Sequence, residues 1–120
     1  MIHNNLTMIN GVAIGADITG SVVMDIHNLS SLTLQATIAG GTSPTGTCKV
    51  QVSNDPPESP LAPFTPSNWF DLANATAAFT DNATKGSASI SVSSYWARVV
   101  WTNTSGSGAL TAIIHAIGQS

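Results

Sequence analysis

Charged side chains are scarce in this sequence of 120 residues, of which only 8% are Asp, Glu, Lys or Arg. Soluble proteins average roughly a quarter. Hydrophobic residues nevertheless make up 42% of the chain, which excludes the disorder that low hydrophobicity and high net charge produce. Many of the remaining positions are Ser, Thr or Asn. These proportions predict one globular domain with a neutral polar surface around an apolar core.

Basic residues are too few for a nucleic-acid-binding surface. Lys49, Lys85 and Arg98 lie far apart in the sequence, whereas neutralising a phosphate backbone needs a clustered cationic patch. No run of residues approaches the ~20 apolar positions of a membrane helix. Residues 1–10 lack the basic start and the apolar stretch of a signal peptide. We therefore expect neither nucleic acid nor a membrane as a partner, and we expect synthesis and folding in the cytoplasm.

Cysteine and histidine are equally sparse. Cys48 is the only cysteine, so no intrachain disulfide can form, and in the alternating run 47–52 we predict a small buried side chain rather than a reactive thiol. The histidines lack the spacing of a zinc motif, and Asp25 and His27 are interpreted as a solvent-exposed pair at a strand end. No nucleophile elbow or phosphate-binding loop occurs. The sequence predicts no catalytic, metal or cofactor site, and hence no enzyme.

The sequence does contain short strand patterns separated by turn residues about every ten positions. Residues 31–38 alternate apolar and polar side chains, and with residues 47–52 they predict a hairpin around a Gly-rich turn. The pattern predicts an all-β, single-domain antiparallel β-sandwich, jelly-roll or Greek-key like, with seven or eight short strands. We expect an extended apolar N-terminal arm at residues 1–20 and the sandwich domain at residues 21–120. Within that domain, residues 53–66 hold five of the six prolines and predict a surface excursion.

The most informative pattern lies near the end of the sequence, where two alternating segments predict a closing hairpin. Tyr95–Thr102 and Ala109–Ile117 are joined by a turn that we place at Ser105–Gly106. In this register Trp101 lies opposite Leu110, and the apolar rows of the two strands form one continuous face toward the core. Trp101 is therefore expected to be a core residue.

The opposite face of this predicted hairpin is also too apolar for open water. Either another segment of the same domain covers it, or a second subunit does. Aromatic residues in and after the proline-rich segment are further candidates for contact with a partner. The candidate interface residues are Trp96, Val100, Ile113, Ile117, Phe64 and Trp69.

Three motifs resemble a recurring pattern in small virion proteins of tailed bacteriophages. They are Cys48-Lys-Val-Gln-Val-Ser-Asn-Asp55, Asn68-Trp-Phe-Asp-Leu72, and Tyr95-Trp-Ala-Arg-Val-Val-Trp followed by Thr104-Ser-Gly-Ser-Gly. The resemblance spans residues 31–118. It implies a β-sandwich capsid decoration, or cement, protein that forms oligomers on the phage head and bridges neighbouring major capsid subunits. It offers no catalytic residue.

This resemblance implies a structural virion protein that decorates and stabilises a phage capsid, located on the capsid surface after assembly in the host cytoplasm. Its implied partners are the major capsid protein and further copies of itself. We expect a homodimer or homotrimer, joined through the apolar second face or the arm at residues 1–20. The alternative is a tail- or fibre-associated adhesion module, in which Trp69, Phe64 or Trp96 binds a host cell-surface glycan.

Overall fold

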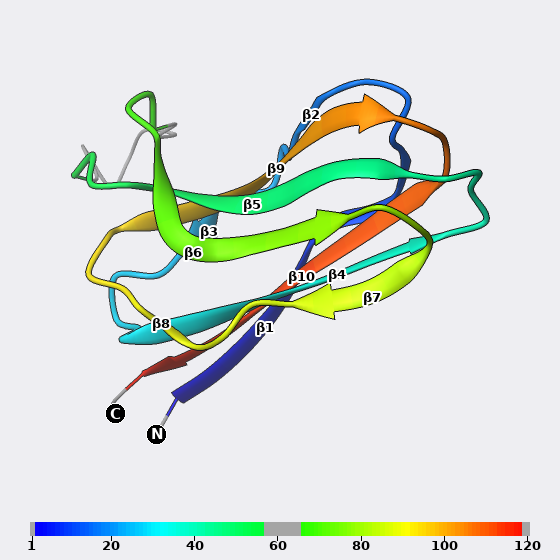
Figure 1. Ribbon diagram of the computed structural model, residues 1–120. Coiled ribbons are helices and arrows are strands. Elements are labelled where there is room, and N and C mark those ends of the chain that lie inside the picture. Colours follow the sequence, from blue (N-terminus) through cyan, green and yellow to red (C-terminus); the bar gives the residue numbers. More distant parts are fainter. Residues whose placement is uncertain (1, 57–65, 119–120) are drawn as a thin grey trace.

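The computed structural model describes residues 2–56 and 66–118, and every helix or strand in these ranges is a β-strand. Two antiparallel sheets of five strands each pack face to face (Figure 1). The predicted all-β antiparallel sandwich is therefore confirmed. The strands are β1 (Ile2–Ala13), β2 (Ile18–Thr19), β3 (Met24–Asp25), β4 (Ser31–Ala39), β5 (Thr45–Ser53), β6 (Phe70–Phe79), β7 (Ala83–Gly86), β8 (Ile90–Ser91), β9 (Trp96–Ser105) and β10 (Ala109–Gly118).

The strands form eight positions in two layers. The first sheet has the order β1-β10-β4-β7, with β8 also paired to β4, and the second sheet has the order β2-β9-β5-β6, with β3 also paired to β9. Because β3 continues the path of β2 along β9, and β8 continues that of β7 along β4, the ten segments fill eight positions. The prediction of seven or eight strands thus agrees with the eight strand positions. Two of these positions are each filled by two short segments rather than by one continuous strand.

Four connections lie together at one end of the sandwich, and we call them the arches. They are residues 14–17, 40–44, 80–82 and 106–108, which join β1 to β2, β4 to β5, β6 to β7, and β9 to β10. Each arch links strands that hold the same position in the two sheets, and Figure 1 shows them side by side at the right. Eight strands connected in this order form a jelly roll.

The predicted closing hairpin is wrong, because β9 and β10 belong to different sheets. β9 pairs with β5, β2 and β3, whereas β10 pairs with β1 and β4. Most of the predicted inward positions are nevertheless correct, since Trp101 and Leu110 are both buried, each facing the core from its own sheet. Tyr95, predicted in the same inward row as Trp101, is instead 39% exposed. The hairpin predicted between residues 31–38 and 47–52 is wrong for the same reason, since β4 lies in the first sheet and β5 in the second.

The arches pack against one another closely enough to require glycine. A Cβ on Gly41 would lie 1.9 Å from the carbonyl oxygen of Ser107. The Asn82 side chain accepts the N–H of Gly41 at 3.0 Å and donates to its carbonyl at 2.9 Å. The Asn103 N–H donates to the Asp17 carboxylate at 2.7 Å, which fastens the first arch to β9. Neighbouring crossings therefore hold each other in place.

The predicted N-terminal arm is instead largely an outer strand of the first sheet. Residues 2–13 form β1, which pairs with β10 along its length. Two register shifts interrupt this pairing, and the sequence neighbours Met8 and Ile9 are both buried, at 2% and 4% exposure. Such bulges break the alternation that marks a strand, which explains why the sequence pattern of residues 1–20 did not indicate one.

One core fills the space between the sheets. The Phe79 and Trp101 rings meet edge to face, with centroids 6.0 Å apart. Cys48 is fully buried and free, as predicted, and burial raises the pKa of its thiol to about 12. Because both sheets contribute to this single apolar cluster, the described chain forms one packing unit.

We expect Gly41→Ala to lower the free energy of unfolding by about 2 kcal/mol or more, because the new methyl group meets backbone atoms of the neighbouring arch. Gly15→Ala is the matched control, since no atom lies within 4 Å of its added Cβ. Urea denaturation of both variants measures the difference. Equal urea midpoints for the two variants would show that neighbouring arches can move apart with little loss of stability.

We expect the Cys48 thiol to resist a thiol-specific reagent at pH 8 in the folded protein, because almost none of it is thiolate and the side chain is buried. The same reagent should label it rapidly in denaturant. Absorbance of the released chromophore follows both reactions. Fast labelling under native conditions, with an unchanged circular dichroism spectrum, would contradict the burial.

Candidate functional site

The structure divides the predicted interface residues between two outer surfaces. Trp96 and Val100 lie on the outer side of the second sheet, because they alternate with the core residues of β9. Ile113 and Ile117 alternate with the core residues of β10 and lie on the outer side of the first sheet. The single apolar face expected from a hairpin is therefore wrong: its two halves face opposite directions.

The two predicted interface residues on the second sheet are covered largely by other parts of the same chain. Val100 is only 8% exposed, between Thr19 and Lys49 on the adjacent strands. Trp96 is partly buried, and its Nε1 donates to the carbonyl oxygen of Asp55 at 2.8 Å. Contacts within one subunit thus hold both side chains.

A hydrogen-bonded network crosses three strands on this outer surface. Arg98 donates from Nε and Nη2 to Oε1 of Gln51, at 2.9 and 2.8 Å. Nε2 of Gln51 donates to one oxygen of Asp71, and Nζ of Lys49 donates to the other, both at 3.0 Å. These bonds, that of Gln51 first, hold the pKa of Asp71 below its usual range. The charges on this surface are therefore already engaged with one another.

Trp69 is tied into the same network. The guanidinium of Arg98 lies 4.4 Å from the Trp69 ring centroid, a cation–π contact. The indole Nε1 also donates to the Pro66 carbonyl at 3.2 Å. Trp69, which the sequence placed among the interface residues, is thus a partly buried side chain with two partners within the chain, and Phe64 lies outside the described residues.

The Asp55 carboxylate organises the described residues that follow the proline-rich segment. It accepts the N–H groups of Ser67 and Asn68 at 2.8 and 3.0 Å, and the Asn68 side-chain amide at 2.9 Å. These three bonds, led by the Asn68 side chain, lower the pKa of Asp55. The Asp55 side chain therefore links residues on either side of 57–65, the part of the predicted excursion that lies outside the described residues.

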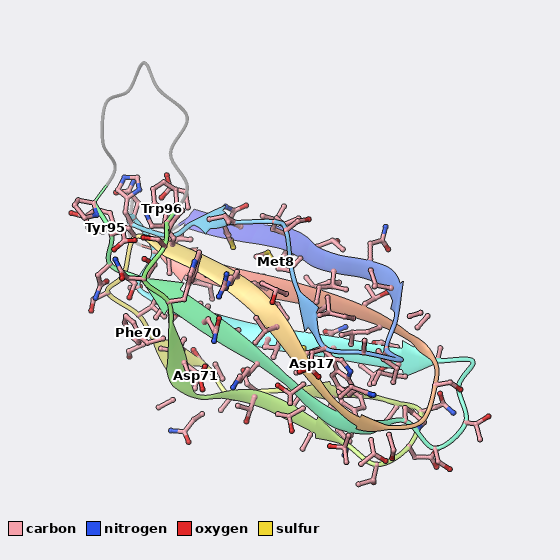
Figure 2. The ribbon with its side chains drawn as sticks, turned by 90° about the horizontal axis from the view of Figure 1, so that it is seen from above. Met8, Asp17, Phe70, Asp71, Tyr95 and Trp96 are labelled. Carbon is pink, nitrogen blue, oxygen red and sulfur yellow. The ribbon has the colours of Figure 1, made fainter. Side chains whose placement is uncertain are left out.

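Exposed aromatic side chains lie at this same end of the second sheet. Tyr95 is 39% exposed and Phe70 is 47% exposed. Both flank the end of β5, since Tyr95 N–H donates to the Ser53 carbonyl and Phe70 pairs with Val52. Figure 2 shows Tyr95 beside Trp96 at one end of the sandwich. Sequence alternation alone did not single out Tyr95 or Phe70, because exposure here depends on the strand ends.

The outer side of the first sheet has a different character, and we call it the threonine face. The strand registers place its residues in rows across β1, β10, β4 and β7. None of them is Asp, Glu, Lys or Arg. They are Asn5, Thr7, Ser31, Thr33, Gln35, Thr37, Thr84, Thr111, Ile113, His115 and Ile117.

Side chains of the threonine face bond to one another across strands. The hydroxyls of Thr37 and Thr84 are 3.0 Å apart, and Nδ1 of His115 forms a hydrogen bond with Oδ1 of Asn5. Ile113 is half-buried among these polar neighbours. The face is therefore a set of side chains without Asp, Glu, Lys or Arg, whose arrangement is largely fixed by the sheet beneath them.

Asp25 and His27 form an exposed pair, as predicted. Nδ1 of His27 lies 2.5 Å from Oδ1 of Asp25, and the two side chains are 49% and 54% exposed.

In residues 2–56 and 66–118, no group of three or more His, Cys, Asp or Glu side chains could hold a metal ion. The same part of the chain contains no helix long and apolar enough to cross a membrane.

Comparisons with known proteins identify the fold. No protein-family model matches the sequence, and no curated protein is significantly similar to it. The chain is similar in structure to the SPBc2 prophage-derived protein YomS, with 12% identity over 97% of this chain and 95% of that chain and a TM-score of 0.54. A structure of infectious bursal disease virus Gx strain also matches, with 11% identity over 99% of this chain and 32% of that chain and a TM-score of 0.40. The first of these likenesses shows a shared sandwich fold.

We expect acid to destabilise the protein partly through Asp55. Its pKa is lower in the folded state than in the unfolded state, so the stability it contributes is present above the unfolded pKa and is lost as pH falls through the lower folded pKa. Asp55→Asn should therefore lower stability at pH 7 and flatten the acid-induced loss. Urea midpoints at pH 7 and at a series of acidic pH values measure both effects, and an unchanged acid dependence would contradict this role.

Proposed function

We propose that this protein is a non-catalytic structural component of a tailed-phage virion that decorates the capsid and stabilises it by bridging major capsid subunits. The observation that carries the proposal is the threonine face. It spans four strand positions of one sheet and contains no Asp, Glu, Lys or Arg. A protein partner is the kind of ligand that matches a broad sheet surface of this kind.

Burying the threonine face against another protein costs little. Ionised groups are expensive to remove from water unless they are paired, and interface centres are depleted in charged residues. Threonine and isoleucine are stiff at χ1, so they lose little freedom when a partner fixes them. Ile113 and Ile117 add apolar area within the face. The charged network of Arg98, Asp71 and Lys49 lies on the opposite side of the sandwich.

Two further observations support the same role. The fold is shared with a prophage-derived protein, and the three sequence motifs resemble those of small phage virion proteins. A rigid jelly roll presented in many copies on a lattice gains strength from engaging several neighbours, because each added contact is effectively intramolecular. We place the protein on the capsid surface, with the major capsid protein and further copies of itself as partners.

Binding to phage heads that lack this protein tests the proposal. We expect the purified protein to co-sediment with such heads in many copies and to raise their heat resistance. Gln35→Glu adds a charge of nearly unchanged shape beside Ile113, and should weaken binding roughly tenfold or more. Asn74→Asp, an exposed position on β6 in the second sheet, is the matched control and should bind normally.

Other results would overturn this proposal. Quantitative mass spectrometry of virions that finds only a handful of copies, confined to the tail, would remove the capsid role. Heads without the protein that resist heat and osmotic shock as well as complete heads would remove the stabilising role. Equal binding by Gln35→Glu and the control would show that the threonine face is not the contact.

The exposed aromatic residues favour a second candidate, a tail- or fibre-associated adhesion module that binds a host cell-surface glycan. Tyr95 and Phe70 are the exposed rings at the excursion end, with Trp96 partly exposed beside Tyr95. Aromatic faces of this kind stack on sugars. Under this role Tyr95→Ala would reduce binding to host cells, while Gln35→Glu would leave it unchanged.

A further inference from the structure

β1 is an open edge of the first sheet. It is 12 residues long, and one side of it pairs with β10. No strand in residues 2–56 and 66–118 pairs with its other side. An edge strand of this kind presents a row of backbone N–H and C=O groups to any strand that approaches.

The other edge strands carry protective features, whereas the first half of β1 carries none. Proteins guard edges with short strands, charges, prolines and bulges. β2, β3 and β8 have two residues each and β7 has four, while the pairing of β6 with β5 is interrupted near Asp71. In contrast, residues 2–7 pair with β10 in an unbroken register, and β1 contains no Asp, Glu, Lys, Arg or Pro.

The bulges confine the regular edge to the first half of β1. The register shifts between Thr7 and Ile9 and between Ile9 and Val12 bend the second half. A hollow of about 390 Å³ follows that bend, lined by residues 7–10 and 12 of β1 and by residues 18–22. Val12, on its rim, is 41% exposed. A hollow with both polar and apolar lining therefore adjoins the regular edge.

We propose that residues 2–7 of β1 pair in antiparallel fashion with the same residues of a second copy. A strand pairs with itself in this way around a two-fold axis, so each copy offers the groups that the other needs. The chain carries a net charge of −3, and two copies approach most easily where neither bears a charge. The regular part of β1 is such a place.

This pairing joins the first sheets of two subunits into one sheet. Asn5 and Thr7 belong to both β1 and the threonine face. Asn5 would lie beside the two-fold axis and Thr7 toward the end of the paired stretch, with one threonine face on either side of the axis. The dimer would therefore present two equivalent faces in one layer. The inference extends the proposed function by supplying two contacts for bridging, and it is tested without any capsid.

Sedimentation equilibrium of the full chain, at micromolar to submillimolar concentrations, is the first measurement. We expect a monomer–dimer equilibrium. Thr7→Lys places a charge on the edge strand, which disfavours pairing with a second strand. It should raise the dimer dissociation constant about tenfold or more. Gln35→Lys is the matched control: it places the same charge on the threonine face opposite Ile113 of β10, away from the edge, and should leave dimerisation unchanged. Circular dichroism verifies that both variants fold.

A cross-linking experiment tests the geometry. Opposed strand residues lie within disulfide reach, so Asn4→Cys or Asn5→Cys should form covalent dimers on mild oxidation. Thr102→Cys, exposed on the second sheet, should not. A wild-type chain that is monomeric throughout, or a dimer disrupted by Gln35→Lys and not by Thr7→Lys, would overturn the pairing. A monomer that still binds heads would overturn this inference alone, and a dimer that does not bind them would overturn the proposed function alone.

Discussion

The close packing of the arches is the constraint on which the rest of the structure depends. Each arch carries the chain from one sheet to the other, and neighbouring arches touch through backbone atoms, as Gly41 does with Ser107. Because every arch joins equivalent positions, the order of strands in one sheet fixes the order in the other. The placement of β10 between β1 and β4, and with it the composition of the threonine face, follows from this arrangement of crossings.

Side-chain alternation could predict which residues face the core, but not which strands are neighbours. A strand that pairs with its successor and one that crosses to the opposite sheet both show a period of two. Trp101 and Leu110 were therefore correctly placed inside, while the hairpin between them was wrong. β1 was missed for a separate reason, because its bulges bury Met8 and Ile9 in succession.

The same ambiguity limited what could be predicted of the candidate site. The outward positions of β4, from Ser31 to Thr37, follow directly from the sequence pattern. That Ile113 joins them, while Trp96 lies on the far side of the molecule, follows only from the strand order. The engagement of Trp69 by Arg98 could not be predicted either, since it depends on residues brought together from separate strands. The local sequence pattern thus predicted whether a residue faces inward or outward. The strand order determined which outward residues lie on the same surface.

The central position of β10 has a consequence for how the subunit is made. β10 is the last strand in the sequence and lies between β1, the first, and β4. During synthesis, β1 therefore has no pairing partner in its own sheet until β10, which follows every other described strand, has left the ribosome. Contacts between such distant segments also slow folding, because a long loop must close before they form. The unguarded first strand must thus stay soluble on a nascent chain, a demand that its polar residues Asn4, Asn5 and Thr7 help to meet.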